Sequence, residues 1–146
     1  MKLIAHRGNT DGRFVSWENE PTYIDMAIKK GFDVEVDVRL IDKVLYLGHD
    51  EAQYGVDLKW FLDRKDSLWI HCKNLEALQF FSGNEDGFNY FWHQNDDFTL
   101  TSKNHIWTYP NKALGKHSIC VMSEHYTFDL PMTIFGMCSD YIEKYK

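Results

Sequence analysis

The feature that most constrains this chain is a series of apolar strands that each end in ionisable residues. In "DVEVDVRL" (33–40) valines alternate with Glu35, Asp37 and Arg39, and a period of two places these sets on opposite faces of a strand. "MKLIAHRG", "VLYLGHD" and "LWIHCKN" also run from apolar residues into histidine, aspartate or lysine. We expect the valines to pack against helices and the charged residues to face a cavity. Buried charges are costly unless they bind a metal or a charged ligand.

The order of the expected elements predicts the fold class. Strands are predicted at 2–6, 33–41, 43–50, 68–73, 89–94, 105–110, 118–124 and 137–142, and helices at 18–31, 57–65 and 75–82. Asn19 is the expected cap of the first helix. Strands that alternate with helices favour parallel pairing through crossover connections. We therefore predict a single α/β domain over residues 1–146, a trimmed TIM-type (β/α) barrel with reduced helices in its second half. Catalytic groups in such a barrel lie at the carboxyl ends of the strands.

Composition narrows the range of partners and compartments. The formal net charge of −6 argues against nucleic acid as a partner. No apolar run approaches the ~18 residues of a membrane span. Cys72, Cys120 and Cys138 lie in apolar contexts without metal-binding spacing, and we expect buried thiols in a reducing compartment. A strand directly after Met1 leaves no room for a signal peptide, so we predict a cytoplasmic protein. A barrel short of helices exposes apolar strand surface, which makes a homo-oligomer possible.

Four short motifs in the first third of the chain carry a family resemblance. "AHRG", then "EN" before a helix, then "GFDVEVDV", then "LGHD" resemble the signature of the glycerophosphodiester phosphodiesterases, in the PLC-like phosphodiesterase superfamily. The match in order and spacing covers residues 4 to 50. More loosely, "LWIHCK", "IWTYP" and "CSDYI" are similar to later strands of that family. The resemblance implies a short member with a TIM barrel and one divalent cation. It also implies hydrolysis of a glycerophosphodiester to an alcohol and glycerol 3-phosphate, a reaction of lipid metabolism.

The resemblance also assigns roles to individual residues. His6 and His49 match the paired general acid and base. Glu35 and Asp37 match two metal carboxylates, and His71 stands at the position of the third ligand. The substrate and phosphate contacts of the family fall on Arg7, Lys73 and Glu18. These residue types suit the chemistry, because cleaving a phosphodiester needs a cation, a group that accepts a proton and a group that donates one.

His71 is the main departure from the family pattern, which has glutamate at this position. The family implies Mg²⁺ or Ca²⁺, but an imidazole ligand shifts the preference toward Mn²⁺, Co²⁺ or Zn²⁺. Only a neutral imidazole can bind a metal, so metal affinity is expected to weaken as the pH falls through ~6.5.

These observations predict metal-dependent hydrolysis of a small-molecule phosphodiester by two histidines. Two alternatives stay open. One is a phospholipase D-like relative in which intramolecular attack releases a cyclic phosphate. The other is a non-catalytic protein that binds a phosphate ligand on the same fold after losing the third carboxylate. An ion pair between Arg7 and Glu18 is as good an interpretation of those two residues as substrate contact. His93 and Trp107 lie on later strands that reach toward the cavity, although core or surface positions are favoured for both.

Overall fold

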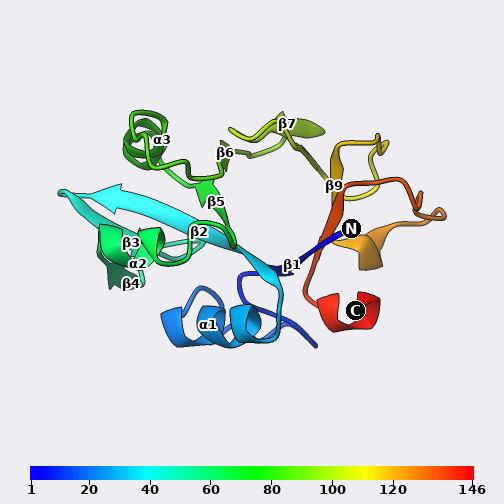
Figure 1. Cartoon of the computed structure of the whole chain (residues 1–146), viewed down its shortest axis with the longest axis horizontal. Coiled ribbons are helices and arrows are strands. Elements are labelled where there is room, and N and C mark those ends of the chain that lie inside the picture. Colours follow the sequence, from blue (N-terminus) through cyan, green and yellow to red (C-terminus); the bar gives the residue numbers. More distant parts are fainter.

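The computed structural model describes residues 1–146 and consists mainly of short strands, with three short helices lying outside the curve of the sheet (Figure 1). The strands are β1 (Lys2–His6), β2 (Asp33–Ile41), β3 (Val44–Leu47), β4 (Tyr54–Val56), β5 (Leu68–Cys72), β6 (Tyr90–Trp92), β7 (Phe98–Leu100), β8 (Ile106–Thr108), β9 (Ser118–Val121) and β10 (Gly136–Ser139). The helices are α1 (Pro21–Lys29), α2 (Leu58–Leu62) and α3 (Leu75–Ser82), with 3-10 turns η1 (Ser123–His125) and η2 (Ile142–Tyr145).

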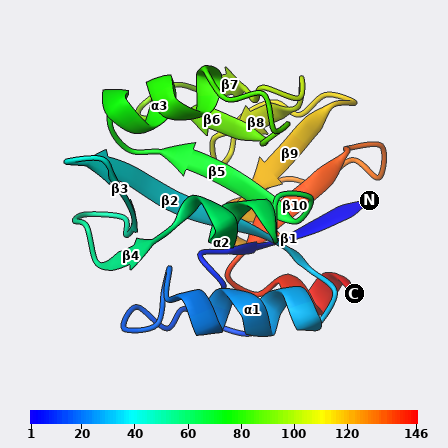
Figure 2. The same cartoon turned by 60° about the vertical axis from the view of Figure 1, so that its left-hand side comes forward.

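Most strands form one curled sheet of mixed direction. Parallel ladders join them in the order β6-β5-β2-β1-β10-β9-β8. Two antiparallel additions extend this arc: β3 and β4 continue from the second half of β2, and β7 pairs with β8. No ladder joins β6 to β7, so the sheet remains a half-barrel. In Figure 2 the long strand β2 runs beside β5 and carries the β3–β4 hairpin beyond it.

The prediction of a trimmed TIM-type barrel is therefore wrong. The expected strand 43–50 does not enter the barrel circuit, because Asp42 and Lys43 both adopt positive φ angles, of 49° and 67°. Two such residues form the tight turn of a β-hairpin, which folds β3 back antiparallel on β2. Beyond β6 the connections hold β7 and the two 3-10 turns instead of helices. The structure thus lacks the alternating helices that define the (β/α) barrel.

Two hydrophobic clusters cover the two faces of the sheet. The larger contains the β2 valines together with Ile24 of α1, Phe61 of α2 and Phe81 of α3, all fully buried. The smaller, on the other face, is rich in aromatic rings and includes Trp69, Phe91 and Trp107. The valine face was predicted correctly, and this packing against helices turns the carboxylates of β2 toward the inside of the curve.

Local caps define where the helices begin. The side chain of Glu20, not Asn19, caps α1 by accepting a hydrogen bond from the Tyr23 backbone N–H, and Pro21 occupies the first turn. Asn19 has a φ of 64° and turns its amide away from the helix, toward β2. The expected cap at Asn19 is therefore wrong, and its side chain serves the site described below.

The structure also bears on two predictions from composition. All three cysteines are buried and free, as expected. None of the helices has both the length and the apolar character that crossing a membrane requires.

Candidate active site and metal centre

The polar residues at the strand ends meet in one cavity of about 490 Å³. Parallel register places His6 of β1 beside Glu35 of β2, and Asp37 of β2 beside His71 of β5. The cavity is lined by residues from both halves of the chain: His6, Arg7, Glu35, His49, His71, Lys73, His93, Gln94, Asn95, Trp107, Tyr109, Pro110, Val121 and Met122. This lining includes both predicted catalytic histidines, two of the three predicted metal ligands and two of the three predicted phosphate contacts. The third metal ligand, Asp37, is fully buried and contacts Arg7 and His71, which line the cavity.

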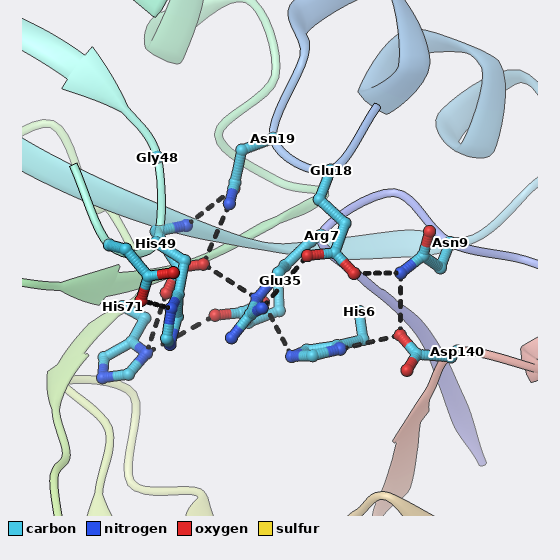
Figure 3. A network of polar contacts seen from close by, with 12 residues as sticks. His6, Arg7, Asn9, Glu18, Asn19, Glu35, Gly48, His49, His71 and Asp140 are labelled. Carbon is cyan, nitrogen blue, oxygen red and sulfur yellow. Dashed lines mark hydrogen bonds and ion pairs between the residues drawn. The ribbon is translucent and has the colours of Figure 1, made fainter. Parts of the chain in front are cut away.

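Glu35, Asp37 and His71 form a compact group that can hold a metal ion. One ligand atom from each residue lies within 4.8 Å of the others. Figure 3 shows the Glu35 carboxylate and the His71 ring in this group. The two carboxylates are 2% and 0% exposed. Glu35 Oε2 has no hydrogen-bond partner, and Asp37 Oδ1 has none while His71 Nδ1, 3.2 Å away, carries no proton. Buried acceptors without a partner are costly, and a bound cation would satisfy both. The donor set of two carboxylates and one imidazole fits a divalent transition metal.

The contacts of His71 fix the orientation of its ring. Nε2 lies 2.9 Å from the backbone carbonyl oxygen of His93, and the ring stacks on Phe91. Since a carbonyl only accepts, Nε2 is the donor, and Nδ1 faces Asp37 Oδ1 at 3.2 Å and Glu35 Oε1 at 3.5 Å. Burial disfavours the imidazolium, but Asp37 and Glu35 outweigh this effect and raise the pKa of His71 to about 9. A proton on Nδ1 therefore competes with a metal for the same position.

Asp37 is held from three sides. Its backbone N–H donates to Asn19 Oδ1 at 3.0 Å, while Asn19 Nδ2 donates to Asp37 Oδ2 at 2.9 Å. Arg7 Nε lies 3.0 Å from the same oxygen. Burial alone would raise the pKa of Asp37, but His71, Arg7 and Asn19 together hold it well below its usual range. The carboxylate is therefore charged and fixed, as a metal ligand must be.

A buried carboxylate orients His6. His6 Nδ1 lies 2.8 Å from Asp140 Oδ1, which also accepts a hydrogen bond from Asn9 Nδ2 at 2.8 Å. The other ring nitrogen, Nε2, lies 3.9 Å from Glu35 Oε2. Burial lowers the pKa of His6, but Asp140 and Glu35 more than compensate, and the net result is a raised pKa. A histidine with one nitrogen held by a carboxylate and the other beside the candidate metal ligand Glu35 is suited to accept or donate a proton.

His49 approaches the cavity from the loop after β3. Its Nδ1 lies 2.6 Å from Asp50 Oδ1, and its side chain is 38% exposed. Arg39 holds this loop by donating to the backbone carbonyls of Gly48, His49 and Glu51, so it does not project freely into the cavity as expected from its strand face. Gly48 is required in the turn, because a Cβ there would lie 2.0 Å from the Glu51 carbonyl oxygen.

The three predicted phosphate contacts occupy different positions. Arg7 lines the cavity and bridges Asp37 to Glu18, to which Nη1 donates at 3.1 Å. Glu18 does not line the cavity; it lies behind Arg7 and also accepts from Asn9 and Arg13. Lys73 lines the cavity, and its ammonium group has neither an ion pair nor a hydrogen bond within the protein. The unpaired ammonium group of Lys73, in the same cavity as the candidate metal ligands, provides a place for an anionic ligand.

Sequence reasoning missed three residues with site positions. Asn19 was assigned to a helix cap, Asp140 had no role despite the noted likeness of "CSDYI" to a closing strand, and His93 was favoured as core or surface. The signals in the sequence for Asn19 and Asp140 were their places in the "EN" and "CSDYI" motifs.

The comparisons with known proteins provide no relative. No protein-family model, curated protein or solved structure matches the chain.

Proposed function

We propose that this protein is a metal-dependent phosphodiester hydrolase that acts on a small glycerophosphodiester. The observation that carries the proposal is the convergence in one cavity of an anchored histidine, an acidic metal group and the free ammonium of Lys73. The resemblance of four motifs to the glycerophosphodiester phosphodiesterases supports the same chemistry.

In this proposal the residues of the cavity have separate roles in binding the cation and the phosphate. Glu35, Asp37 and His71 would hold one divalent cation, which when bound draws the negative charge of the phosphodiester and favours attack at phosphorus. Arg7 and Lys73 neutralise the remaining phosphate charge. Hydrolysis breaks the bond between phosphorus and the alcohol oxygen, and a water molecule supplies a hydroxyl to phosphorus and a proton to the alcohol.

His6 and His49 handle the protons of this reaction. One imidazole accepts the proton of the attacking oxygen, and the other donates a proton to the departing alcohol oxygen. We assign the accepting role to His6, because Asp140 holds its Nδ1 and stabilises the imidazolium that forms. His49, on an exposed loop, is the donor in this assignment. Attack by a hydroxyl of the substrate, in place of water, would instead give a cyclic phosphate with the same residues.

One observation favours a second candidate function, a non-catalytic phosphate-binding protein. With a pKa of about 9, His71 carries a positive charge near neutral pH and compensates Glu35 and Asp37 without a metal ion. Lys73 and Arg7 would still bind an anion in that state.

Turnover of phosphodiesters distinguishes these candidates. Bis(p-nitrophenyl) phosphate and glycerophosphocholine are incubated with the metal-free protein, then with Mg²⁺, Ca²⁺, Mn²⁺, Co²⁺ or Zn²⁺. We expect cation-dependent release of product that a chelator stops and that His6→Ala reduces at least ~100-fold, whereas His117→Ala, at an exposed position outside the cavity, serves as the matched control. Absence of turnover with every cation, together with binding of inorganic phosphate, would establish the non-catalytic function instead.

A further inference from the structure

A second set of polar side chains lines the cavity beside the proposed phosphate site. His93, Gln94 and Asn95 follow β6, and Tyr109 follows β8. No hydrogen bond within the protein reaches any of their side chains, although backbone groups of His93, Gln94 and Tyr109 are paired. Gln94, Asn95 and Tyr109 are exposed and can bond to water, but His93 is buried, and its unpaired Nδ1 requires an ordered water or a ligand.

His93 is the anchored member of this set. The residue is 9% exposed, and its backbone carbonyl accepts the hydrogen bond from His71 Nε2. Its ring packs against Tyr109 with centroids 5.4 Å apart, and the buried Nδ1 lies 3.7 Å from Asp96 Oδ2 without a hydrogen bond. A buried ring with an unpaired nitrogen can discriminate between ligands, because leaving that nitrogen unpaired in a complex is costly.

Two kinds of ligand fit this part of the cavity poorly. A quaternary ammonium has neither a hydrogen-bond donor nor an acceptor, so it would leave the buried Nδ1 of His93 unpaired. Only four of the fourteen lining residues are hydrophobic, which gives an acyl chain little surface to bury against. Hydroxyl groups suit the remaining features, since they both donate to and accept from His93, Gln94 and Tyr109.

We propose that His93, with Gln94 and Tyr109, forms a subsite for the hydroxyl groups of the alcohol in the phosphodiester. The protein therefore selects a polyhydroxylated alcohol over choline or an acylated alcohol. This inference rests on the proposed function for the phosphate position but not on turnover.

Binding to a catalytically impaired variant tests the subsite directly. Calorimetry on His6→Ala with saturating Mn²⁺ compares glycerophosphoinositol, glycerophosphocholine and a lysophosphatidylcholine below its micellar concentration. We expect glycerophosphoinositol to bind at least ~10-fold more tightly than either of the others, in keeping with two or three added hydrogen bonds. Adding His93→Phe, which keeps the ring volume but removes both nitrogens, should bring this ratio close to one. His117→Phe, at an exposed position away from the cavity, is the matched control and should leave the ratio unchanged.

Each other outcome has a defined meaning. A ratio close to one in His6→Ala, tighter binding of either competitor, no binding of any diester, or a ratio that His93→Phe does not alter would overturn the subsite. Should His93→Phe fail to fold, Gln94→Leu and Tyr109→Phe replace it, each expected to lower the ratio ~3-fold. Turnover of bis(p-nitrophenyl) phosphate by the wild type separates the two proposals: turnover without the ratio removes only the subsite, and the ratio without turnover removes only catalysis.

Discussion

His71 contributes to the charge of the site, and in the proposed function it also sets the metal preference. Each ring nitrogen has its own partner. Nδ1 faces the carboxyl groups of Asp37 and Glu35, and Nε2 donates to the His93 carbonyl. Glutamate at this position would add a third negative charge, whereas histidine supplies a proton that compensates two buried carboxylates when no metal is bound. The sequence predicted competition between proton and metal near pH 6.5. The contacts raise the pKa to about 9, so the competition extends to higher pH.

This raised pKa predicts how the stability of the metal-free protein changes with pH. The folded pKa of about 9 exceeds the unfolded value of ~6.5, so the folded state binds the proton more tightly. The resulting stabilisation is fully present below pH ~6.5 and is lost as the pH rises through about 9. We expect the free energy of unfolding, from urea titrations with chelator present, to fall by roughly 1–3 kcal/mol across this window.

His71→Gln provides the control for that measurement, because glutamine fills similar space without titrating. Its free energy of unfolding should fall by less over the same window, because only His6, whose pKa is also raised, still loses its proton there. Equal slopes in the two proteins would show that His71 does not carry the proton.

At the scale of elements, the β2–β3 hairpin separates this fold from a barrel. Its turn depends on Asp42 and Lys43, which are exposed and adopt the left-handed backbone conformation. The hairpin also sets the loop that carries His49, since Gly48 N–H donates to the Asp37 carbonyl and Arg39 holds the loop beyond it. The turn therefore links the fold to the site.

The left-handed conformation of Lys43 predicts how a glycine at this position changes stability. A non-glycine residue in the left-handed region pays roughly 1 kcal/mol, so Lys43→Gly should raise the free energy of unfolding by about 0.5 kcal/mol despite the added freedom of the unfolded chain. Gln79→Gly, at an exposed position within α3, should instead lower it by about 1 kcal/mol. Urea denaturation of the three proteins checks both. A loss of stability in Lys43→Gly comparable to that of Gln79→Gly would argue against the hairpin.

At the scale of the whole molecule, the sequence was informative wherever a pattern is local. Alternation in β2 correctly assigned the valines to the helical side. Positions at strand ends and the motifs identified six of the fourteen residues that line the cavity, namely His6, Arg7, Glu35, His49, His71 and Lys73. No local pattern showed that the barrel would stay open. It stays open because Asp42 and Lys43, neither of which is glycine, adopt positive φ angles, and because the connections after β6 are short. Asn19 and Asp140 were missed because their partners, Asp37 and His6, are distant in the sequence.

A half-barrel is sufficient to position the residues of this site. Parallel ladders between β1, β2 and β5 place His6, the carboxylates and His71 side by side, and β10 adds Asp140 from the other end of the chain. The remaining strands contribute the wall formed by Trp107 and Tyr109. The geometry therefore needs only this part of the arc, and it tolerates the missing helices.

The most direct test of the central claim is the position of a metal ion in the protein. Crystals soaked with Mn²⁺ above pH 9, where His71 is mostly deprotonated, give an anomalous difference map that locates the ion without assumptions about its ligands. We expect one peak about 2.0–2.3 Å from a carboxylate oxygen of Glu35, a carboxylate oxygen of Asp37 and His71 Nδ1. An empty cluster with His71 Nδ1 still against Asp37, or a peak only at another position, would contradict the metal-dependent function proposed for this protein.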